Sequence, residues 1–376
     1  LWFEGRFPSG DRSLRLGPPR AARGVLAVSD RAGFDAQRGP VGLPQTGTNL
    51  KTILVTGGAG YIGSHACKAL RAAGYTPIAY DSLATGWQDS VRFGPFEKGD
   101  LLDRARLDEV FRKYRPAAVM HFAALSLVGE SMENPGLYWR NNVLGSLNLV
   151  EAAVAAGCLD FVFSSTCATY GDQDGVVLDE NSVQQPINAY GASKRAVEDI
   201  LANFGASHGL RSVIFRYFNV AGSDPDGEIG ECHRPETHLV PVLLEVISGQ
   251  REALSLFGTD YPTPDGTCIR DYVHVSDLVD AHLLGVKWLE TGKGSRVFNL
   301  GTGTGFSVRE VIAKSGAVTN LPVPVVEKPR RPGDAAMLVS GSARAIEELG
   351  WSPKRSDLAT MISDAWRWHQ GGHYEK

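Results

Sequence analysis

The sequence has few cysteines, and their arrangement is not one typical of a bound metal. Its 376 residues include five cysteines, an odd number, at widely separated positions: Cys67, Cys158, Cys167, Cys232 and Cys268. There is no Cys-x-x-Cys pair and no histidine spacing typical of a zinc site. We therefore predict no metal site and a reducing, cytoplasmic location.

The sequence also lacks a long apolar run and an excess of positive charge. Its most apolar stretch, residues 117–129, contains His121 and Ser126 and is shorter than the ~20 apolar residues that a membrane helix needs. The formal net charge is −4, whereas a nucleic-acid or membrane surface needs basic residues that neutralise phosphates. We therefore expect a protein that neither spans a membrane nor binds nucleic acid, while a single anionic ligand remains compatible.

Residues 1–50 differ in composition from the rest of the chain. They hold seven arginines, no lysine, many glycines and prolines, and no sustained periodicity. We expect this segment to be disordered. An arginine-rich start is typical of an organelle-targeting peptide, but four acidic residues and the prolines weaken an amphipathic helix. The alternative is an extension outside the native protein, which the absence of an initial methionine favours.

From Lys51 onward, short β-branched runs alternate with amphipathic helical stretches, which is typical of βαβ units. The sequence therefore predicts an α/β protein with a doubly wound, parallel Rossmann sheet. Strands are predicted at residues 52–56, 77–80, 118–122, 161–164 and 212–216. Helices are predicted at residues 62–73 and 103–114, among others.

The alternating rhythm loosens after Asn219, where glycine, proline and aspartate become frequent. This change predicts a smaller C-terminal α/β domain. We assign residues 51–220, with about 268–300, to the Rossmann domain. The second domain then comprises about residues 221–267 and 301–376.

A glycine-rich loop at residues 57–63, Gly-Gly-Ala-Gly-Tyr-Ile-Gly, follows the first predicted strand and opens a helix. Gly57 permits the tight turn, Gly60 lets the backbone approach a pyrophosphate, and Gly63 allows close packing of helix and strand. The N–H groups and partial positive charge of a helix N-terminus suit phosphate groups. This context predicts a dinucleotide site.

The residues around this loop refine the prediction. Tyr61 and Ile62 belong to the first helical turn at the pyrophosphate. Asp81, about 20 residues further on, stands where a carboxylate accepts the adenosine ribose hydroxyls and repels a 2′-phosphate, which favours NAD over NADP. Asp100 and Leu101 follow a third strand and can cap the adenine. For Asp100 an N-cap of the next helix is an equal alternative.

Tyr190 and Lys194 are four residues apart at the predicted start of a helix, so the phenol and the ammonium share one face. A free phenol has a pKa of about 10. A nearby lysine charge and an oxidised nicotinamide would both favour the phenolate, which makes Tyr190 a candidate general base. A tyrosine packed on a surface helix gives the same spacing by chance, so the dinucleotide loop is what favours a redox role.

Four further stretches carry a family resemblance. Residues 163–171 read Phe-Ser-Ser-Thr-Cys-Ala-Thr-Tyr-Gly, residues 216–219 Arg-Tyr-Phe-Asn, residues 237–241 Thr-His-Leu-Val-Pro, and residues 270–275 Arg-Asp-Tyr-Val-His-Val. With the glycine loop and the Tyr-x-x-x-Lys helix, they resemble the extended short-chain dehydrogenase/reductase family and, within it, the UDP-glucose 4-epimerases. The resemblance covers essentially residues 51–370.

The resemblance implies roles around the cofactor. Thr166 would bond the sugar 4-hydroxyl and relay its proton to Tyr190, although a strand-end threonine that satisfies local backbone is the alternative. Lys194 would also bond the nicotinamide ribose. Further positions match the family's cofactor groove or lie beside the nicotinamide, and each can equally be simple core: Phe122, Ala123, Ala124, Asn142, Tyr217 and Phe218.

The resemblance also implies a UDP-sugar site. Asn219, His238 and Leu239 match UDP contacts, and Phe257 lies in the uracil region. Arg270 and Arg331 match diphosphate-binding arginines, whose planar fork gives bidentate contacts. Two further positions belong to this set, Asp334 at the ribose and Leu338 at the wall of the sugar site.

The expected activity is reversible C4 epimerisation of UDP-glucose and UDP-galactose through a 4-keto intermediate and transient NADH, in a homodimer. UDP-xylose/arabinose and UDP-N-acetylhexosamines remain alternative substrates. A nucleotide-sugar 4,6-dehydratase would need Asp-Glu after Thr166, where this chain has Cys167 and Ala168. A non-catalytic NAD-binding protein typically lacks the tyrosine or the lysine, and a uronate decarboxylase has no positive support.

Overall fold

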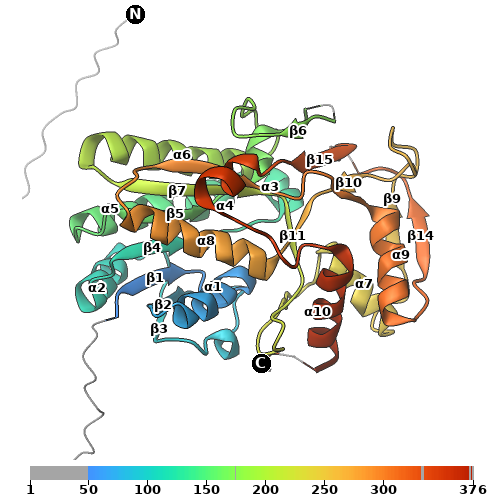
Figure 1. Ribbon diagram of the computed structural model, residues 1–376, viewed down its shortest axis with the longest axis horizontal. Coiled ribbons are helices and arrows are strands. Elements are labelled where there is room, and N and C mark those ends of the chain that lie inside the picture. The colour runs from blue at the N-terminus through green and yellow to red at the C-terminus, as the bar shows by residue number, and fades with distance from the viewer. Residues whose placement is uncertain (1–49, 174, 332–333, 372–373, 375–376) are drawn as a thin grey trace, which may run out of the picture. The chain divides into compact units, whose positions relative to one another are not determined.

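A computed structural model describes residues 50–173, 175–331, 334–371 and 374 (Figure 1). The expected disorder and the two alternative origins of residues 1–50 fall, apart from Leu50, outside these described residues. Within them, no helix combines the length and the apolar character that crossing a membrane requires.

A parallel sheet of seven strands forms the centre of the described chain, in the order β12-β7-β5-β4-β1-β2-β3. Every neighbouring pair in it is parallel. The strands are β1 (Thr52–Thr56), β2 (Thr76–Asp81), β3 (Phe96–Lys98), β4 (Ala118–His121), β5 (Asp160–Ser164), β7 (Arg211–Tyr217) and β12 (Arg296–Leu300). The predicted doubly wound Rossmann sheet is confirmed, and the five predicted strands agree with observed ones to within one residue at each end.

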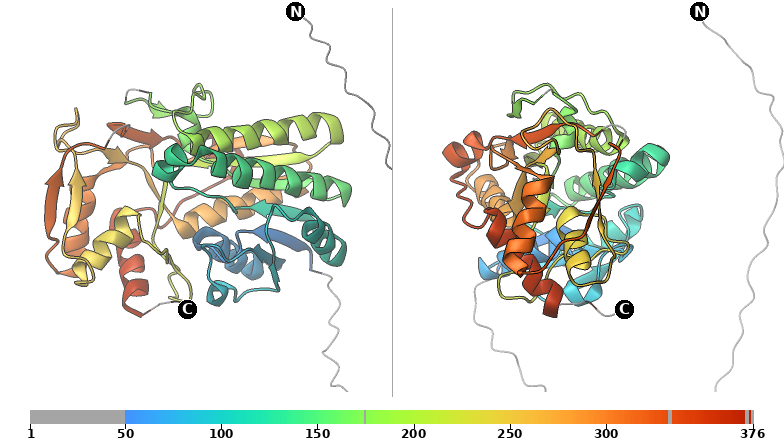
Figure 2. Two further views of the ribbon diagram at one scale, coloured as in Figure 1. Left: turned by 180° about the vertical axis from the view of Figure 1, so that it is seen from behind. Right: turned by 90° about the vertical axis from the view of Figure 1, so that its right-hand side faces the viewer.

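Helices cover both faces of this sheet (Figures 1 and 2). On one face α1 (Tyr61–Ala72) packs beside α8 (Val275–Glu290), and on the other lie α2 (Arg104–Tyr114), α5 (Gly145–Ala155) and α6 (Ala189–His208). Strand β1 serves both faces, because Ile53 and Val55 join the first apolar core and Leu54 the second. The alternation of side chains along a strand explains why buried parallel strands are apolar throughout.

Short elements connect the main strands and helices. They comprise the 3₁₀ turns η1 (Gln88–Ser90) and η3 (Cys167–Tyr170), the helices α3 (Val128–Glu133) and α4 (Pro135–Tyr138), the π-type segment η2 (Trp139–Leu144), and the strand β6 (Val177–Leu178). Segments α3, α4 and η2 all contact α6.

The C-terminal half adds a third apolar core around α7 (Leu239–Ile247), α9 (Val308–Thr319) and α10 (Leu358–Gly371) (Figure 1). Its strands are β8 (Asn219–Ala221), β9 (Leu254–Phe257), β10 (Ile269–Arg270), β11 (Tyr272–His274), β13 (Phe306–Ser307), β14 (Val325–Lys328) and β15 (Met337–Ser340). The π-type segment η4 (Ala345–Leu349) packs instead against the main sheet, with Trp351. The predicted division into two domains stays a prediction.

Candidate active site

The glycine-rich loop joins β1 to α1 at the carboxyl edge of the sheet. Gly57 has a φ of +72°, and a Cβ there would lie 2.7 Å from the backbone nitrogen of Ala123. A Cβ at Gly63 would lie 2.0 Å from the Gly57 carbonyl oxygen, so both positions require glycine. Gly60 is the N-cap of α1, and the first turn, which begins with Tyr61 and Ile62, has no acidic side chain. This helix N-terminus therefore fits a pyrophosphate.

Asp81 ends β2 directly beside this loop. Its carboxylate accepts the N–H of Ala59 at 3.1 Å and the N–H of Leu83 at 2.8 Å. Burial raises the pKa of Asp81, and these two hydrogen bonds oppose the rise. Because each carboxylate oxygen can accept a second hydrogen bond, Asp81 fits the ribose of a dinucleotide as predicted.

Asp100 and Leu101 follow β3. Leu101 is buried, whereas Asp100 is exposed and accepts the N–H of Leu102 at 2.8 Å. The N-cap of α2 is Asp103, whose carboxylate accepts the N–H of Arg106 at 3.0 Å. The alternative in which Asp100 caps this helix is therefore wrong, because Asp100 lies one turn too early.

The segment after β4 carries the predicted groove residues Phe122, Ala123 and Ala124, all half-buried. Buried Asn142 supports this segment, because its amide exchanges two hydrogen bonds of 2.9 Å with the backbone of Leu125. The same amide donates to Ser193 Oγ at 3.1 Å. Asn142 thus ties the wall of the groove to α6, in agreement with a supporting role behind the cofactor.

Tyr190 and Lys194 lie in the first two turns of α6, as predicted. The start of this helix approaches η3 closely, since a Cβ at Gly191 would lie 2.4 Å from the carbonyl oxygen of Ala168. Glycine at this position allows this close approach, and the Tyr190 phenol lies near the Thr166 hydroxyl. Lys194 is buried and donates from Nζ to the carbonyl oxygen of Ser164 at 2.8 Å.

Burial shifts the protonation equilibria of this pair. Burial raises the pKa of Tyr190 to about 12, and the neighbouring Thr166 hydroxyl opposes the rise. Burial lowers the pKa of Lys194 to about 7, although the Glu198 carboxylate opposes that shift. That the lysine charge and an oxidised nicotinamide together favour the phenolate stays a prediction.

Three hydroxyl groups meet where β5 and β7 end. The Tyr217 phenol hydrogen-bonds to Ser164 Oγ, and Thr166 Oγ1 lies 3.5 Å from the Tyr217 carbonyl oxygen. Thr166 Oγ1 also accepts the N–H of Ala168 at 3.1 Å and so caps η3. The structure therefore shows Thr166 as a local backbone partner, and its predicted bond to the sugar 4-hydroxyl stays a prediction.

The chain continues from Tyr217 toward the predicted UDP residues. Phe218 packs on a small core with Tyr170 and Leu178 rather than standing free. Asn219 begins β8, which pairs with β11, and its side-chain amide donates to the Asp271 carbonyl oxygen at 3.2 Å. Asn219 is thereby placed next to the segment that carries Arg270.

Two of the predicted UDP residues form an ion pair, Arg270 on β10 and Asp334 in the segment before β15. Arg270 pairs in register with Leu338 of β15, and Arg270 Nη2 lies 3.3 Å from Asp334 Oδ1. The guanidinium also donates to the carbonyl oxygens of Ile269 and Ala335, at 2.9 Å each. The structure therefore groups Arg270, Asp334 and Leu338.

A second group contains Phe257 and Arg331. The Arg331 guanidinium stacks over the Phe257 ring, 3.9 Å from its centroid. Arg331 is exposed, and Phe257 ends β9. An aromatic ring and an arginine side by side fit a base and a phosphate.

The remaining predicted substrate residues open α7, where His238 is the N-cap and Leu239 the first helical residue. The His238 imidazole contacts another side chain of the same loop, because its Nδ1 lies 2.6 Å from Glu231 Oε1. Two more side chains, His233 and Glu236, join this group. Sequence analysis missed the cluster, although its Glu-x-His-x-x-Glu-x-His spacing was visible.

Sequence analysis also missed a buried ion pair beneath the candidate catalytic residues. Glu198 accepts from Arg216 Nη2 at 2.5 Å and from Ser165 Oγ at 2.5 Å. Arg216 Nη1 in turn donates to the Tyr170 hydroxyl at 2.8 Å. This network fixes the residue before Thr166 and places a carboxylate one turn after Lys194.

Asp271 is a further missed residue. Its buried carboxylate accepts from Thr302 N at 2.9 Å, from Thr302 Oγ1 at 2.7 Å and from Ser340 N at 3.1 Å. These bonds join the segment after Arg270 to the loop after β12 and to β15. Asp271 therefore holds together the elements that carry Arg270 and Leu338.

Comparison with known proteins identifies the class. Residues 53–301 match the model of the NAD dependent epimerase/dehydratase family, so the chain belongs to that family. The UDP-glucose 4-epimerase of Rhizobium leguminosarum bv. trifolii is 51% identical over 319 residues, covering 85% of this chain and 97% of the relative.

Two solved structures share the fold over nearly their whole length. UDP-glucose 4-epimerase from Brucella ovis, in complex with NAD, has a TM-score of 0.82 and 48% identity, covering 84% of this chain and 97% of its own. The Bifidobacterium longum enzyme, in complex with NAD⁺ and UDP, has a TM-score of 0.81 and 32% identity, covering 86% and 99%. The particular relatives of this chain are thus UDP-glucose 4-epimerases.

Proposed function

We propose that this chain catalyses the reversible C4 epimerisation of UDP-glucose and UDP-galactose with NAD as its cofactor. The single observation that carries the proposal is the grouping of the Tyr190 phenol with the neighbouring Thr166 hydroxyl, with Lys194 one turn away, at the sheet edge where the glycine loop begins α1. Two relatives that are each 51% identical to this chain are named UDP-glucose 4-epimerases. The family model itself is that of NAD dependent enzymes.

The chemistry divides between the chain and its cofactor. Tyr190, as phenolate, removes the proton of the sugar 4-hydroxyl, and Thr166 relays or orients that proton. NAD bound by the glycine loop and Asp81 would supply a hydride acceptor and donor at C4. Rotation of the 4-keto sugar would then expose its opposite face, and Tyr190 would give the proton back to the 4-oxygen. No net oxidation occurs, and the product differs only at C4.

The phenolate must form despite the burial that raises the pKa of Tyr190. Lys194 lies against the Phe163 ring at 4.9 Å and donates to a backbone carbonyl, so it is fixed in place. We infer that Lys194 holds the nicotinamide ribose and that the positive charge of the oxidised nicotinamide lowers the pKa of the phenol.

The UDP moiety is held by the two arginine groups in this proposal. Arg331, stacked on Phe257, and Arg270, paired with Asp334, offer forks that suit a diphosphate. Leu338 lies beside Arg270 and limits the room for substituents on the sugar. We infer that plain hexoses are favoured over N-acetylhexosamines, with UDP-xylose/arabinose as further alternatives.

The residues after Thr166 oppose the dehydratase alternative. Elimination of water needs an acid and a base next to the sugar. Cys167 is fully buried, and burial raises the pKa of its thiol beyond the range of a useful acid. Ala168 carries no titratable group. The chain therefore retains the first half-reaction of a dehydratase without the groups for the second.

The test is an assay of purified protein against a panel of UDP-sugars, with and without added NAD. We expect UDP-glucose and UDP-galactose to interconvert fastest, and turnover without added NAD would show resident cofactor. Slower turnover of UDP-N-acetylglucosamine than of UDP-glucose would agree with Leu338. A protein that interconverts neither hexose at any NAD concentration would contradict the proposal.

We also propose a homodimer formed through the segment before α5. Five exposed apolar side chains lie on α3, α4 and η2, namely Val128, Met132, Leu137, Trp139 and Leu144. An apolar surface of this kind is typical of an interface, and twofold pairing buries the same patch on both copies. A cytoplasmic location stays a prediction from the sequence.

Light scattering tests the dimer. We expect the mass of two chains for the wild type and of one chain for a Trp139→Glu/Leu144→Glu variant. Leu321→Glu is the control, because Leu321 is similarly exposed but lies between α9 and β14. A wild-type mass of one chain would contradict the proposal.

A further inference from the structure

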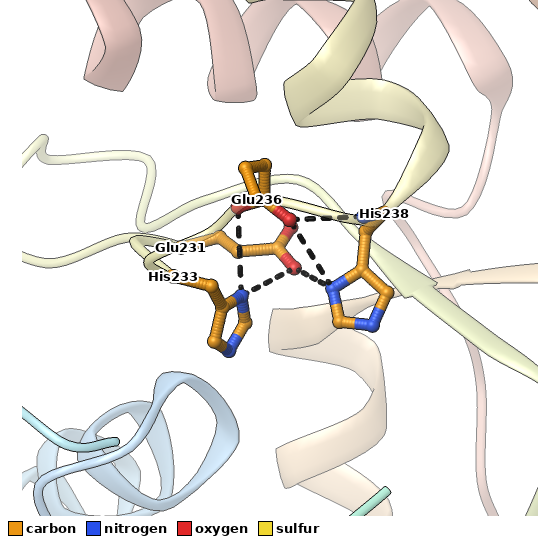
Figure 3. A group of neighbouring side chains, drawn as sticks. All are labelled: Glu231, His233, Glu236 and His238. Carbon is orange, nitrogen blue, oxygen red and sulfur yellow. Dashed lines mark hydrogen bonds and ion pairs between the residues drawn. The ribbon is translucent and has the colours of Figure 1, made fainter. Parts of the chain in front are cut away.

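Four side chains from one loop converge ahead of α7 (Figure 3). They are Glu231, His233, Glu236 and His238, and each directs one nitrogen or oxygen atom toward the others, with all four atoms within 4.8 Å of one another. His233 Nδ1 is buried and makes no hydrogen bond of normal geometry among the described residues, but it lies at ion-pair distance from the carboxylates of Glu231 and Glu236. Two imidazoles and two carboxylates facing one point are the ligand types that bind zinc.

Three nitrogen–oxygen separations in this cluster are close to those of a tetrahedral site. His233 Nδ1 lies 3.4 Å from Glu231 Oε1 and 3.5 Å from Glu236 Oε2, and His238 Nδ1 lies 3.7 Å from the other Glu236 oxygen, Oε1. Bonds of about 2.0–2.1 Å in a tetrahedron separate neighbouring ligand atoms by about 3.3 Å. The Glu231–His238 pair, at 2.6 Å, is closer and must open slightly.

Charge also favours a divalent cation. Glu231 and Glu236 place two carboxylates beside two imidazoles in a partly buried position. A divalent ion bound between them would balance the two negative charges, and buried charges are commonly paired or coordinated to a metal in this way.

A second acidic group in the same loop shows what a filled cluster looks like. Asp224, Asp226 and Glu228 also converge. The ammonium of Lys68 already occupies their centre, at 2.8, 2.7 and 2.6 Å from the three carboxylates. Lys68 therefore balances the charge of the group at 224–228 without a metal ion. The four residues of the cluster at 231–238 include no lysine or arginine.

We propose that Glu231, His233, Glu236 and His238 bind one zinc-type divalent transition-metal ion. All four positions are protein ligands, so the ion is structural and leaves no coordination position for catalysis. Glu236 is further oriented because its Oε1 accepts the N–H groups of Thr237 and His238 at 2.7 and 2.9 Å. Such support of a ligand is typical of metal sites.

The site would brace two parts of the proposed active site at once. His238 is the N-cap of α7, whose first residue, Leu239, is a proposed UDP contact. On the other side of the cluster, the Tyr61 phenol at the start of α1 donates to the Gly222 carbonyl oxygen at 2.6 Å. Burial raises the pKa of this phenol most, and the nearby charges of Glu231 and Glu236 raise it further. The bound ion would thus fix the loop that lies between α1, the helix after the glycine-rich loop, and α7.

The experiment uses the full chain without a histidine tag, stripped of metal with a chelator and then titrated with Co²⁺ alone. We expect one Co²⁺ per chain, with the intense visible absorption of a tetrahedral site, and displacement by Zn²⁺. His233→Ala and Glu236→Gln should each weaken Co²⁺ binding at least about tenfold. Loss of a residue that only supports a ligand already lowers metal affinity by about 10- to 100-fold, and loss of the ligand itself should lower it further.

Two matched variants serve as controls. Glu228→Gln removes a carboxylate from the same loop, and His208→Ala removes an exposed histidine from α6, so both should bind Co²⁺ like the wild type. Retention of NAD checks that each variant is folded. If a variant does not fold, the titration of the wild type still shows whether the chain binds one Co²⁺ ion. Absence of stoichiometric binding, or equal affinity in His233→Ala and the wild type, would overturn the proposal.

Discussion

Replacing Tyr190 by phenylalanine is expected to reduce kcat by about 10²- to 10⁴-fold, the range that general acid–base catalysis supplies, while NAD remains bound. The phenol lies beside the Thr166 hydroxyl, and in the proposed reaction its loss leaves no base at the sugar 4-hydroxyl. The ring itself is retained, so packing at the start of α6 changes little. Initial rates of UDP-galactose conversion and the NAD content of the purified variant measure the two effects separately.

Tyr75→Phe is the matched control for this variant. Its phenol also hydrogen-bonds to a side chain, at 3.0 Å from Glu290, but it lies before β2 at the opposite edge of the sheet. The control should keep the wild-type rate. Unchanged turnover in Tyr190→Phe would mean that another group removes the proton, and loss of NAD would mean that the phenol acts in binding.

Replacing Glu198 by glutamine should lower the free energy of unfolding by about 3–5 kcal/mol, because it leaves the buried Arg216 guanidinium without its counter-charge. The amide keeps the size of the carboxylate, so the loss reflects charge rather than a cavity. Urea denaturation, followed by circular dichroism at a fixed NAD concentration, measures this change through the midpoint.

Glu151→Gln is the control for charge removal at a helix surface. Glu151 pairs with Arg104 in the open, and such pairs contribute at most about 1 kcal/mol. If Glu198→Gln cost no more than this control, the Glu198–Arg216 pair would not be the support beneath Thr166 and Lys194 that the geometry indicates. If Glu198→Gln kept the wild-type stability but had a lower kcat, Glu198 would instead act only through its effect on Lys194.

The order of strands and helices around the dinucleotide loop could be predicted because it depends on local patterns. Each strand is a short β-branched run, and Gly57 and Gly63 have roles that follow from a tight turn and close packing. The placement of Tyr190 followed from helical spacing in the same way. The cap of α2 could not be assigned, since Asp100 and Asp103 both suit the role and only the backbone geometry distinguishes them.

Long-range partners were beyond prediction from one sequence. Glu198 meets Arg216 only because α6 packs on β7, and Asp271 meets Thr302 only because two strand ends converge. The burial that shifts the pKa values of Tyr190 and Lys194 was likewise not visible, because it depends on how the elements pack around them. The spacing at 231–238 was visible, but the loop conformation decides whether its side chains converge.

The central claim is that the hydrogen on C4 leaves one face of the sugar and returns to the other within the same active site. Conversion of UDP-galactose deuterated at C4, in ordinary water, tests this claim most directly. The predicted result is UDP-glucose that retains the deuterium at C4, formed at equal yield with or without added NAD. Loss of the deuterium to solvent would contradict a hydride transfer and, with it, the assigned roles of Tyr190 and its neighbours.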